Sequence, residues 1–114
     1  MSKEDPRLIP IQKALVHNTE KNANTDFLTS SISPSKSPSI FRIMVSIDTA
    51  ARFEADITYS SAEITTYFNQ GSDLTANCLY TFDLILSSGD SVNFQVDDNV
   101  TILVFRVLEI PSSI

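Results

Sequence analysis

The sequence predicts an all-β protein: an antiparallel β-sandwich of jelly-roll or immunoglobulin-like type with an extended N-terminal arm. Apolar and polar residues alternate from residue 39 to residue 110, as expected for strands with one buried and one solvent-facing side. Turn residues interrupt this alternation roughly every 8–12 residues, a spacing typical of sandwiches and barrels. No segment has the 3.6-residue apolar repeat of an amphipathic helix.

Length and composition indicate one domain preceded by an arm. A chain of 114 residues has room for a single hydrophobic core. We assign residues 1–38 to the N-terminal arm and linker, and residues 39–114 to the β-sandwich domain. Residues 33–38 are rich in serine, and Pro34 and Pro38 cannot donate ladder hydrogen bonds, so this stretch is expected to be a linker.

The rest of the arm is expected to be mostly extended. Pro6 and Pro10 disfavour a helix before residue 11. Residues 11–16 fit either a short strand or a single helical turn, and we favour extended structure. Residues 22–26 are turn-like, and residues 27–32 fit an edge strand.

The domain itself is predicted to consist of successive short strands. In the first of them Phe41, Ile43 and Val45 share one side. The second and third strands are separated only by two serines and are expected to form a hairpin. Gly89 is available for a positive φ in a later hairpin turn. The predicted strands cover residues 39–47, 51–59, 62–69, 78–86, 91–96 and 100–110.

Two of these strands, at residues 78–86 and 100–110, are dense in apolar residues, which predicts central positions, and the strand at 78–86 is expected to be buried on both faces. On the second face of the last strand, Leu103, Phe105 and Val107 have no evident cover within the chain. An open apolar face of this kind usually meets a partner or another copy. We therefore expect an oligomer interface there.

The arm supplies the other expected interface residues. If its scattered apolar side chains are buried on adjacent copies, each contributes roughly 1.5–3 kcal/mol, and a few of them exceed the cost of ordering a short segment. On this hypothesis, deletion of residues 1–38 leaves a folded domain that no longer assembles. The expected anchors are Leu8, Ile9, Ile11, Leu15, Val16, Phe27 and Leu28.

The charge distribution disfavours nucleic acid as a partner. The chain has a net charge of −6, and residues 37–114 hold three arginines and no lysine against ten acidic residues. Affinity for nucleic acid depends largely on cations that neutralise phosphates. No apolar run reaches the roughly 18–20 residues that cross a bilayer, and no secretory signal is evident. We therefore expect no membrane partner, and synthesis in the cytoplasm.

The chain lacks the residue combinations of a catalytic or zinc site. His17 is the only histidine and Cys78 the only cysteine, which leaves too few nitrogen and sulfur ligands for zinc. A histidine on an arm is also poorly placed to activate a nucleophile. Cys78 is expected to be a small, buried apolar residue. These considerations predict a protein that is not an enzyme and has no cofactor.

Most polar residues of the domain have a structural interpretation. Asp90, Asp97, Asp98 and Asn99 offer oxygen ligands for calcium, but these residue types are also the usual ones in turns, which we favour. The aromatic residues Tyr59, Tyr67 and Phe68 suit core packing better than a platform for sugars or bases.

Arginine is the only cation of the domain, and its positions require partners. Arg42 and Arg106 lie within apolar strands, where an unpaired charge would be costly. We expect an ion pair within the chain, or else a bridge between subunits. The candidate acidic partners are Glu54, Asp56, Asp83 and Glu109.

Two segments carry a family resemblance. Residues 74–83 and 88–95 contain a strand, a Gly-Asp turn at Gly89-Asp90 and a strand with Asn93-Phe94, followed by a long final apolar strand. This texture resembles small β-sandwich structural proteins of tailed phages and archaeal viruses, such as capsid decoration proteins and tail or baseplate components. The resemblance implies a virion subunit that forms a homo-oligomer, often a trimer, and contacts other virion proteins.

Two other function classes stay open. A carbohydrate- or receptor-binding module would use the turns within residues 62–77 and 87–99. An enzyme would require carboxylates such as Asp56 and Asp83 to converge in one pocket. A non-enzymatic virion structural protein that oligomerises through its arm and an apolar sheet face remains the leading hypothesis.

Overall fold

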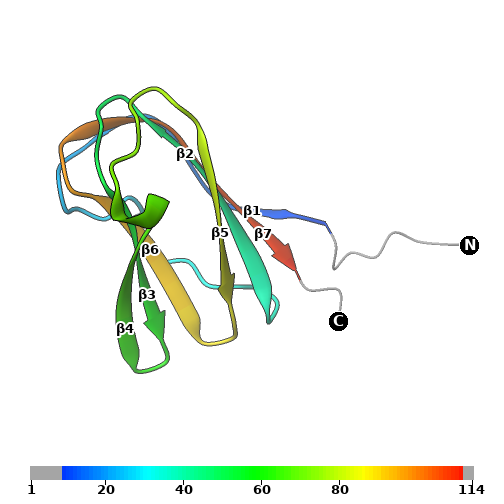
Figure 1. Cartoon of the computed structure of the whole chain (residues 1–114). Coiled ribbons are helices and arrows are strands. Elements are labelled where there is room, and N and C mark those ends of the chain that lie inside the picture. Colours follow the sequence, from blue (N-terminus) through cyan, green and yellow to red (C-terminus); the bar gives the residue numbers. More distant parts are fainter. Residues whose placement is uncertain (1–8, 112–114) are drawn as a thin grey trace, which may run out of the picture.

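The computed structural model describes residues 9–111, which form a sandwich of two antiparallel sheets (Figure 1). This confirms the predicted all-β sandwich class. The four-stranded sheet has the order β1–β7–β2–β5, and the three-stranded sheet has the order β4–β3–β6. The strands are β1 (Ile11–Lys21), β2 (Ser39–Ile47), β3 (Phe53–Tyr59), β4 (Ala62–Tyr67), β5 (Tyr80–Leu86), β6 (Asp90–Val96) and β7 (Val100–Pro111).

Phenylalanine rings fill the space between the sheets. Phe53 of β3 lies at the centre of this cluster, with its ring stacked on that of Phe94 at 5.7 Å between centroids and on that of Phe68 at 5.0 Å. Phe105 of β7 meets Phe94 edge to face at 5.0 Å. Such tilted and offset pairs add stability beyond the area they bury. The cluster contains side chains from both sheets, so the inner face of each sheet is buried by the other sheet.

The segment assigned to the arm lies in the same sandwich. Its first part, β1, pairs antiparallel with β7 and is an outer strand of the four-stranded sheet. The next part runs along the free edge of β6: the amide N–H groups of Asn24, Phe27 and Ile32 donate to carbonyl groups of β6 at 2.8–3.0 Å. Residues 27–32 form no strand, and only Ile32 makes a single bridge, to Val92.

The linker at residues 33–38 is also held to the sandwich, through Glu109 of β7. This carboxylate is fully buried and accepts hydrogen bonds from the N–H groups of Ser35 and Lys36 and from the hydroxyl of Ser39. Lys13 of β1 lies 3.6 Å from it. A buried charge is tolerated when it is paired and hydrogen-bonded, as it is here. The linker therefore adopts one fixed path across the end of β7.

β5 occupies an edge, not the central position predicted from its apolar content. Only β2 pairs with it. Phe82 and Leu84 face the core, whereas Ile85 on the other side is 69 % exposed. Cys78, just before β5, is exposed and not buried as expected. β7, in contrast, is central, as predicted, because β1 and β2 flank it.

In the second half of β7, the side chains that were expected on the open face point into the core, and the alternate side chains point outward. Phe105 and Val107 are fully buried in the core instead of lying on an open face. The cause is an irregularity in the pairing with β2, where Ser46 pairs with Val104 and Ile47 pairs with Ile102, which leaves Leu103 as an extra residue. A bulge of one residue shifts every later side chain to the opposite face.

No helix among residues 9–111 is long enough to span a bilayer. The helical structure in this part of the chain is a short 3₁₀ helix, η2 (Asn69–Gly71), in the connection between β4 and β5.

Candidate functional site

The outer face of the four-stranded sheet carries an apolar row that crosses three strands. Ile85 of β5 pairs with Ile40 of β2, which pairs in turn with Ile110 of β7. Because Phe41 and Glu109, the next residues along their strands, are fully buried, these isoleucines point away from the core. Ile85 is 69 % and Ile40 is 36 % exposed. We call these three residues the isoleucine row.

The row next to it is charged but neutralised within the chain. Arg42 donates from Nε and Nη2 to the two carboxylate oxygens of Asp83, both at 2.9 Å. This pair holds the pKa of Asp83 below its ordinary value, mainly through the hydrogen bonds. The predicted ion pair of Arg42 is thus confirmed, with Asp83 as the partner. The bidentate geometry lets an otherwise apolar face contain an arginine without an uncompensated charge.

Further along the same face the side chains are mixed. Met44 pairs with Arg106, which pairs with Leu15 of β1. Arg106 donates from Nε to the amide oxygen of Gln12 at 3.0 Å, so its partner is neutral and not an acid. Leu15 is 55 % exposed. The outer face therefore combines the isoleucine row with Met44, Leu15 and two arginines, each of which has a polar hydrogen-bond partner in its own chain.

The expected interface residues divide into three groups in the structure. Ile9, Ile11 and Leu15 are exposed, and Val16, Leu28 and Leu103 are partly buried. Phe27, Phe105 and Val107 belong to the core of their own chain and offer no surface to a neighbour. Leu8 lies outside the described residues. The expectation that the arm's anchors are buried on adjacent copies is therefore wrong for Phe27, and it stays a prediction for the exposed and partly buried anchors.

Sequence reasoning missed the isoleucine row. The alternation in residues 39–47 contained the signal for Ile40, since its neighbours were assigned to the core. The positions of Ile85 and Ile110 beside it depend on which strands pair and in which register, and the sequence does not encode that directly.

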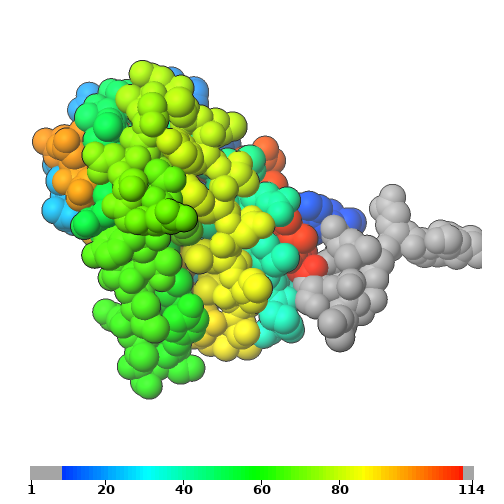
Figure 2. Space-filling view, viewed as in Figure 1, coloured from blue at the N-terminus to red at the C-terminus, as the bar shows by residue number. Residues whose placement is uncertain are grey.

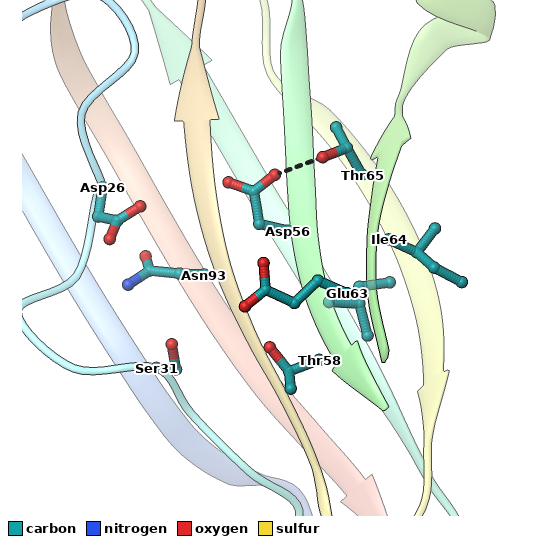
Figure 3. A pocket seen from close by; sticks show the side chains of 9 residues that line it. Asp26, Ser31, Asp56, Thr58, Glu63, Ile64, Thr65 and Asn93 are labelled. Atoms are coloured by element: carbon teal, nitrogen blue, oxygen red, sulfur yellow. Dashed lines mark hydrogen bonds between the residues drawn. The ribbon is translucent and has the colours of Figure 1, made fainter. Parts of the chain in front are cut away.

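The outer face of the other sheet is polar and acidic. Asp56 of β3, Glu63 of β4 and Asp26 surround a hollow of about 370 Å³ (Figure 3). The Asp56 carboxylate accepts a hydrogen bond from the hydroxyl of Thr65 at 3.0 Å. Asn93, at the base of the hollow, is saturated by backbone groups of Leu28 and Phe94. The lining residues supply carboxylates and hydroxyls but no aromatic ring.

One carboxyl on this acidic face is strongly perturbed. Burial, together with a hydrogen bond to Asp56 and the charge of that residue, raises the pKa of Glu54 to about 7. Arg52 opposes this shift, and its guanidinium also lies 4.2 Å from the ring centroid of Tyr67. Glu54 and Asp56 are two residues apart on one strand, so their side chains lie on the same face. Repulsion between the two carboxylates favours a state in which only one of them is ionised.

The other sites considered from the sequence do not assemble. Asp56 and Asp83 lie on the outer faces of different sheets, so these two carboxylates do not converge. Among residues 9–111 no cluster of three or more histidine, cysteine, aspartate or glutamate residues could hold a metal ion. His17 is exposed on β1. Phe68 packs in the core and Tyr67 lies against Arg52, so they form no platform with Tyr59.

The turn interpretation of the acidic residues is confirmed, because each bonds a backbone N–H group. Asp97 accepts from Arg52, Asp98 from Asn99 and Asp90 from Ser87, each at 2.8 Å.

In comparisons with known proteins, no family model, curated protein or solved structure matches the chain.

Proposed function

We propose that this protein is a non-enzymatic structural subunit that assembles through the outer face of its four-stranded sheet. The observation that carries the proposal is the isoleucine row, three neighbouring aliphatic side chains on the solvent side of a sheet whose other side is a complete core. Exposed apolar patches on small proteins commonly mark interaction sites. Burial of the exposed part of these side chains would stabilise an association, and Ile85, at 69 % exposure, would contribute most.

The two outer faces support an oriented assembly. The acidic side chains Asp56 and Glu63 project from the three-stranded sheet and would repel the same face of a second copy. On the four-stranded sheet, Arg42 and Asp83 neutralise each other and leave the isoleucines to make contact. The protein therefore has one face suited to association and one suited to solvent.

The resemblance to small β-sandwich proteins of tailed phages and archaeal viruses suggests where such a subunit acts. We propose a virion component, a capsid decoration or tail protein, whose partners are itself and other virion proteins. A virion component co-purifies with particles through a density gradient. Recovery of the protein only from particle-free fractions would contradict this part of the proposal.

The association surface is tested by substitution on β2. I40E/M44E replaces two outward-facing apolar residues by carboxylates that lie beside Arg42 and opposite Arg106, so the fold should be kept. The matched control is I64E, which places a carboxylate at a 49 % exposed isoleucine of β4 on the other sheet. Multi-angle light scattering should show oligomers of the wild type and of I64E, but not of I40E/M44E. A wild type that stays monomeric at every concentration would overturn the proposal.

A second candidate function is a carbohydrate-binding module. The hollow at Asp56, Glu63 and Asp26 is lined by hydrogen-bonding groups that suit a hydroxyl-rich ligand. It has no aromatic face on which a sugar ring could stack, which is why we rank it second. A glycan array probed with the wild type and with D56N tests it: binding by the wild type that D56N abolishes would favour it.

A further inference from the structure

The two most exposed large apolar side chains of residues 9–111 lie at the two ends of one edge strand. They are Ile85, which is 69 % exposed, and Leu79, which is 63 % exposed and directly precedes β5. In Figure 2 the yellow segment that contains β5 faces the viewer, between the green hairpin of β3 and β4 and the cyan start of β2. Among residues 9–111, β2 is the only strand paired with β5, so the other edge of β5 has no partner strand.

β5 also lacks the features that protect the other edges. β1 has a register shift between Gln12 and Ala14 and a left-handed residue, Asn18, with φ of 48°. The free edge of β6 is covered by residues 24–32. β5 pairs with β2 without any irregularity and contains no lysine, proline or glycine. Bulges, charges and covering segments are what natural edge strands use against pairing, and β5 has only the charge of Asp83, which Arg42 neutralises.

β4 is an edge strand as well, but charge disfavours it. Glu63 of β4 and Asp56 of β3 give this edge a negative outer face. A second copy would bring the same charges against them.

We propose that β5 pairs antiparallel with β5 of a second copy, about a two-fold axis at Phe82, so that the two four-stranded sheets become one continuous sheet. The inference rests on the proposed function, because it names the partner and the contact by which assembly begins. A two-fold contact uses the same residues twice and closes on itself.

The register follows from the side chains of β5. With Phe82 opposite Phe82, Leu79 of each copy lies opposite Ile85 of the other, and Asp83 lies opposite Thr81. A shift of two residues places Asp83 opposite Asp83 in one direction and opposite Leu79 in the other, and both are unfavourable. A shift of one residue places the outer face of one copy beside the inner face of the other. Phe82 opposite Phe82 is therefore the self-complementary register.

In this register the isoleucine row becomes longer. Ile110, Ile40 and Ile85 of one copy are followed by Leu79 of the second copy. The edge contact thus joins the apolar faces of both copies on one side of a single sheet, where each alone has a row of three side chains.

Charge substitution at the two exposed positions tests the pairing. In L79K/I85K, lysines oppose lysines at both ends of the contact, whereas in L79E/I85K each glutamate opposes a lysine. We expect the dimer dissociation constant to rise at least about tenfold in L79K/I85K relative to L79E/I85K. A mixture of L79K/I85K with L79E/I85E should form heterodimers. Both side chains are exposed, so at concentrations below the dimer dissociation constant the urea midpoints of all variants should match that of the wild type.

The register can be measured with a spin label on Cys78, the single cysteine of the chain. Cys78 is exposed and lies four residues before Phe82, so two Cys78 residues in the proposed dimer are separated by eight residues along the shared strands. At 3.4 Å per residue the Cα atoms are about 27 Å apart. A nitroxide attached to Cys78 should give this distance, broadened by the label, in a dipolar electron paramagnetic resonance experiment.

The outcomes separate this inference from the proposed function. Oligomers that I40E/M44E abolishes but L79K/I85K leaves intact would overturn the β5 contact and support the proposed face. A spin–spin distance incompatible with about 27 Å would overturn the register and with it the two-fold pairing. Loss of association in L79K/I85K, with recovery in L79E/I85K, supports the inference.

Discussion

Both carboxylate oxygens of Glu109 accept a hydrogen bond from the backbone N–H of Ser35, at 3.0 and 2.8 Å. These residues are 74 positions apart in the chain, and the contact fixes the linker before β2 to the end of β7. Because the carboxylate is fully buried, its loss would leave several donors without an acceptor.

Glu109→Gln should therefore destabilise the protein by about 1–3 kcal/mol. An amide presents one oxygen and one NH₂ group, so one of the donors at Ser35, Lys36 or Ser39 faces another donor. Urea denaturation measures the loss, and hydrogen exchange should become faster at the Ser35 and Lys36 amides. Glu63→Gln, on the exposed acidic face, serves as the control and should change stability by less than about 0.5 kcal/mol. Equal stability of both variants would contradict the role of Glu109.

Stability should fall at acidic pH in a way that depends partly on Glu109. Burial raises the pKa of this carboxyl, but the hydrogen bonds from Ser35, Ser39 and Lys36 outweigh it and leave the pKa below its ordinary value of 4.5. A carboxyl with a lowered pKa stabilises the fold above its ordinary value, and this contribution is lost as the pH falls through the lowered pKa. The free energy of unfolding of Glu109→Gln should thus depend less on pH below about 4.5 than that of the wild type. Asp83 also has a lowered pKa, so some dependence remains.

Glu54 should have the opposite effect. Its pKa is raised from 4.5 to about 7, so the folded protein holds the proton more tightly than the unfolded chain. The stability that this provides is present below the ordinary pKa and is lost as the pH rises through about 7. Glu54→Gln should be more stable than the wild type at about pH 8, and the difference should shrink towards about pH 5. A difference that does not change with pH would contradict the raised pKa, which an NMR titration of the carboxyl also measures.

Phe27 distinguishes a folded N-terminal segment from a free arm. It is 4 % exposed, and its ring lies 5.1 Å from that of Phe105 and 5.7 Å from that of Phe53. Phe27→Ala should lower the free energy of unfolding by about 3–5 kcal/mol. The control is Leu15→Ala, at a 55 % exposed position of β1, with an expected loss below about 0.5 kcal/mol.

Deletion of residues 1–38 is the stronger form of the same test. It removes β1 and Phe27, so we expect loss of the cooperative unfolding transition, not the folded domain expected from sequence. A deletion variant that unfolds cooperatively would show that the sandwich does not need this segment.

Sequence patterns predicted the strands whose sides differ in polarity. The strand at residues 39–47 agrees with β2, and the hairpin expected at 51–59 and 62–69 agrees with β3 and β4, where Ser60 has a positive φ in the turn. In these strands one side meets the core and the other meets solvent, so the alternation of apolar and polar residues indicates both the strand and its buried side.

The same reasoning failed where other constraints determine the structure. β1 extends to Lys21 although its later residues are polar, because the backbone of β7 supplies its hydrogen bonds. β5 has apolar side chains on both sides. One side packs against the core, whereas Ile85 on the other side is exposed, and composition alone does not distinguish a buried from an exposed apolar residue. The side reversal in β7 arises at Leu103 from one unpaired residue.

The sequence predicted that an apolar sheet face exists, but not which residues form it. An apolar sheet face was expected, but on Leu103, Phe105 and Val107, whereas the structure places it on Ile40, Ile85 and Ile110. Only Ile40 was readable as an outward residue of its own strand, because residues 78–86 were expected to be covered on both faces and the irregularity at Leu103 reverses the side of Ile110. The alignment of the three isoleucines across three strands is a property of the register, which long-range pairing sets.

The central position of β7 also determines when the protein can fold. Of its two neighbours, β2 also pairs with β5, whereas β1 has β7 as its only partner strand in the sheet, so the N-terminal strand stays unpaired until β7 is in place. The pairings of β7 with β1 and β2 therefore span large sequence separations, which slows folding. Until β7 has paired, the apolar strands of unfolded chains are exposed to one another, and a chaperone that shields them should raise the yield of folded protein.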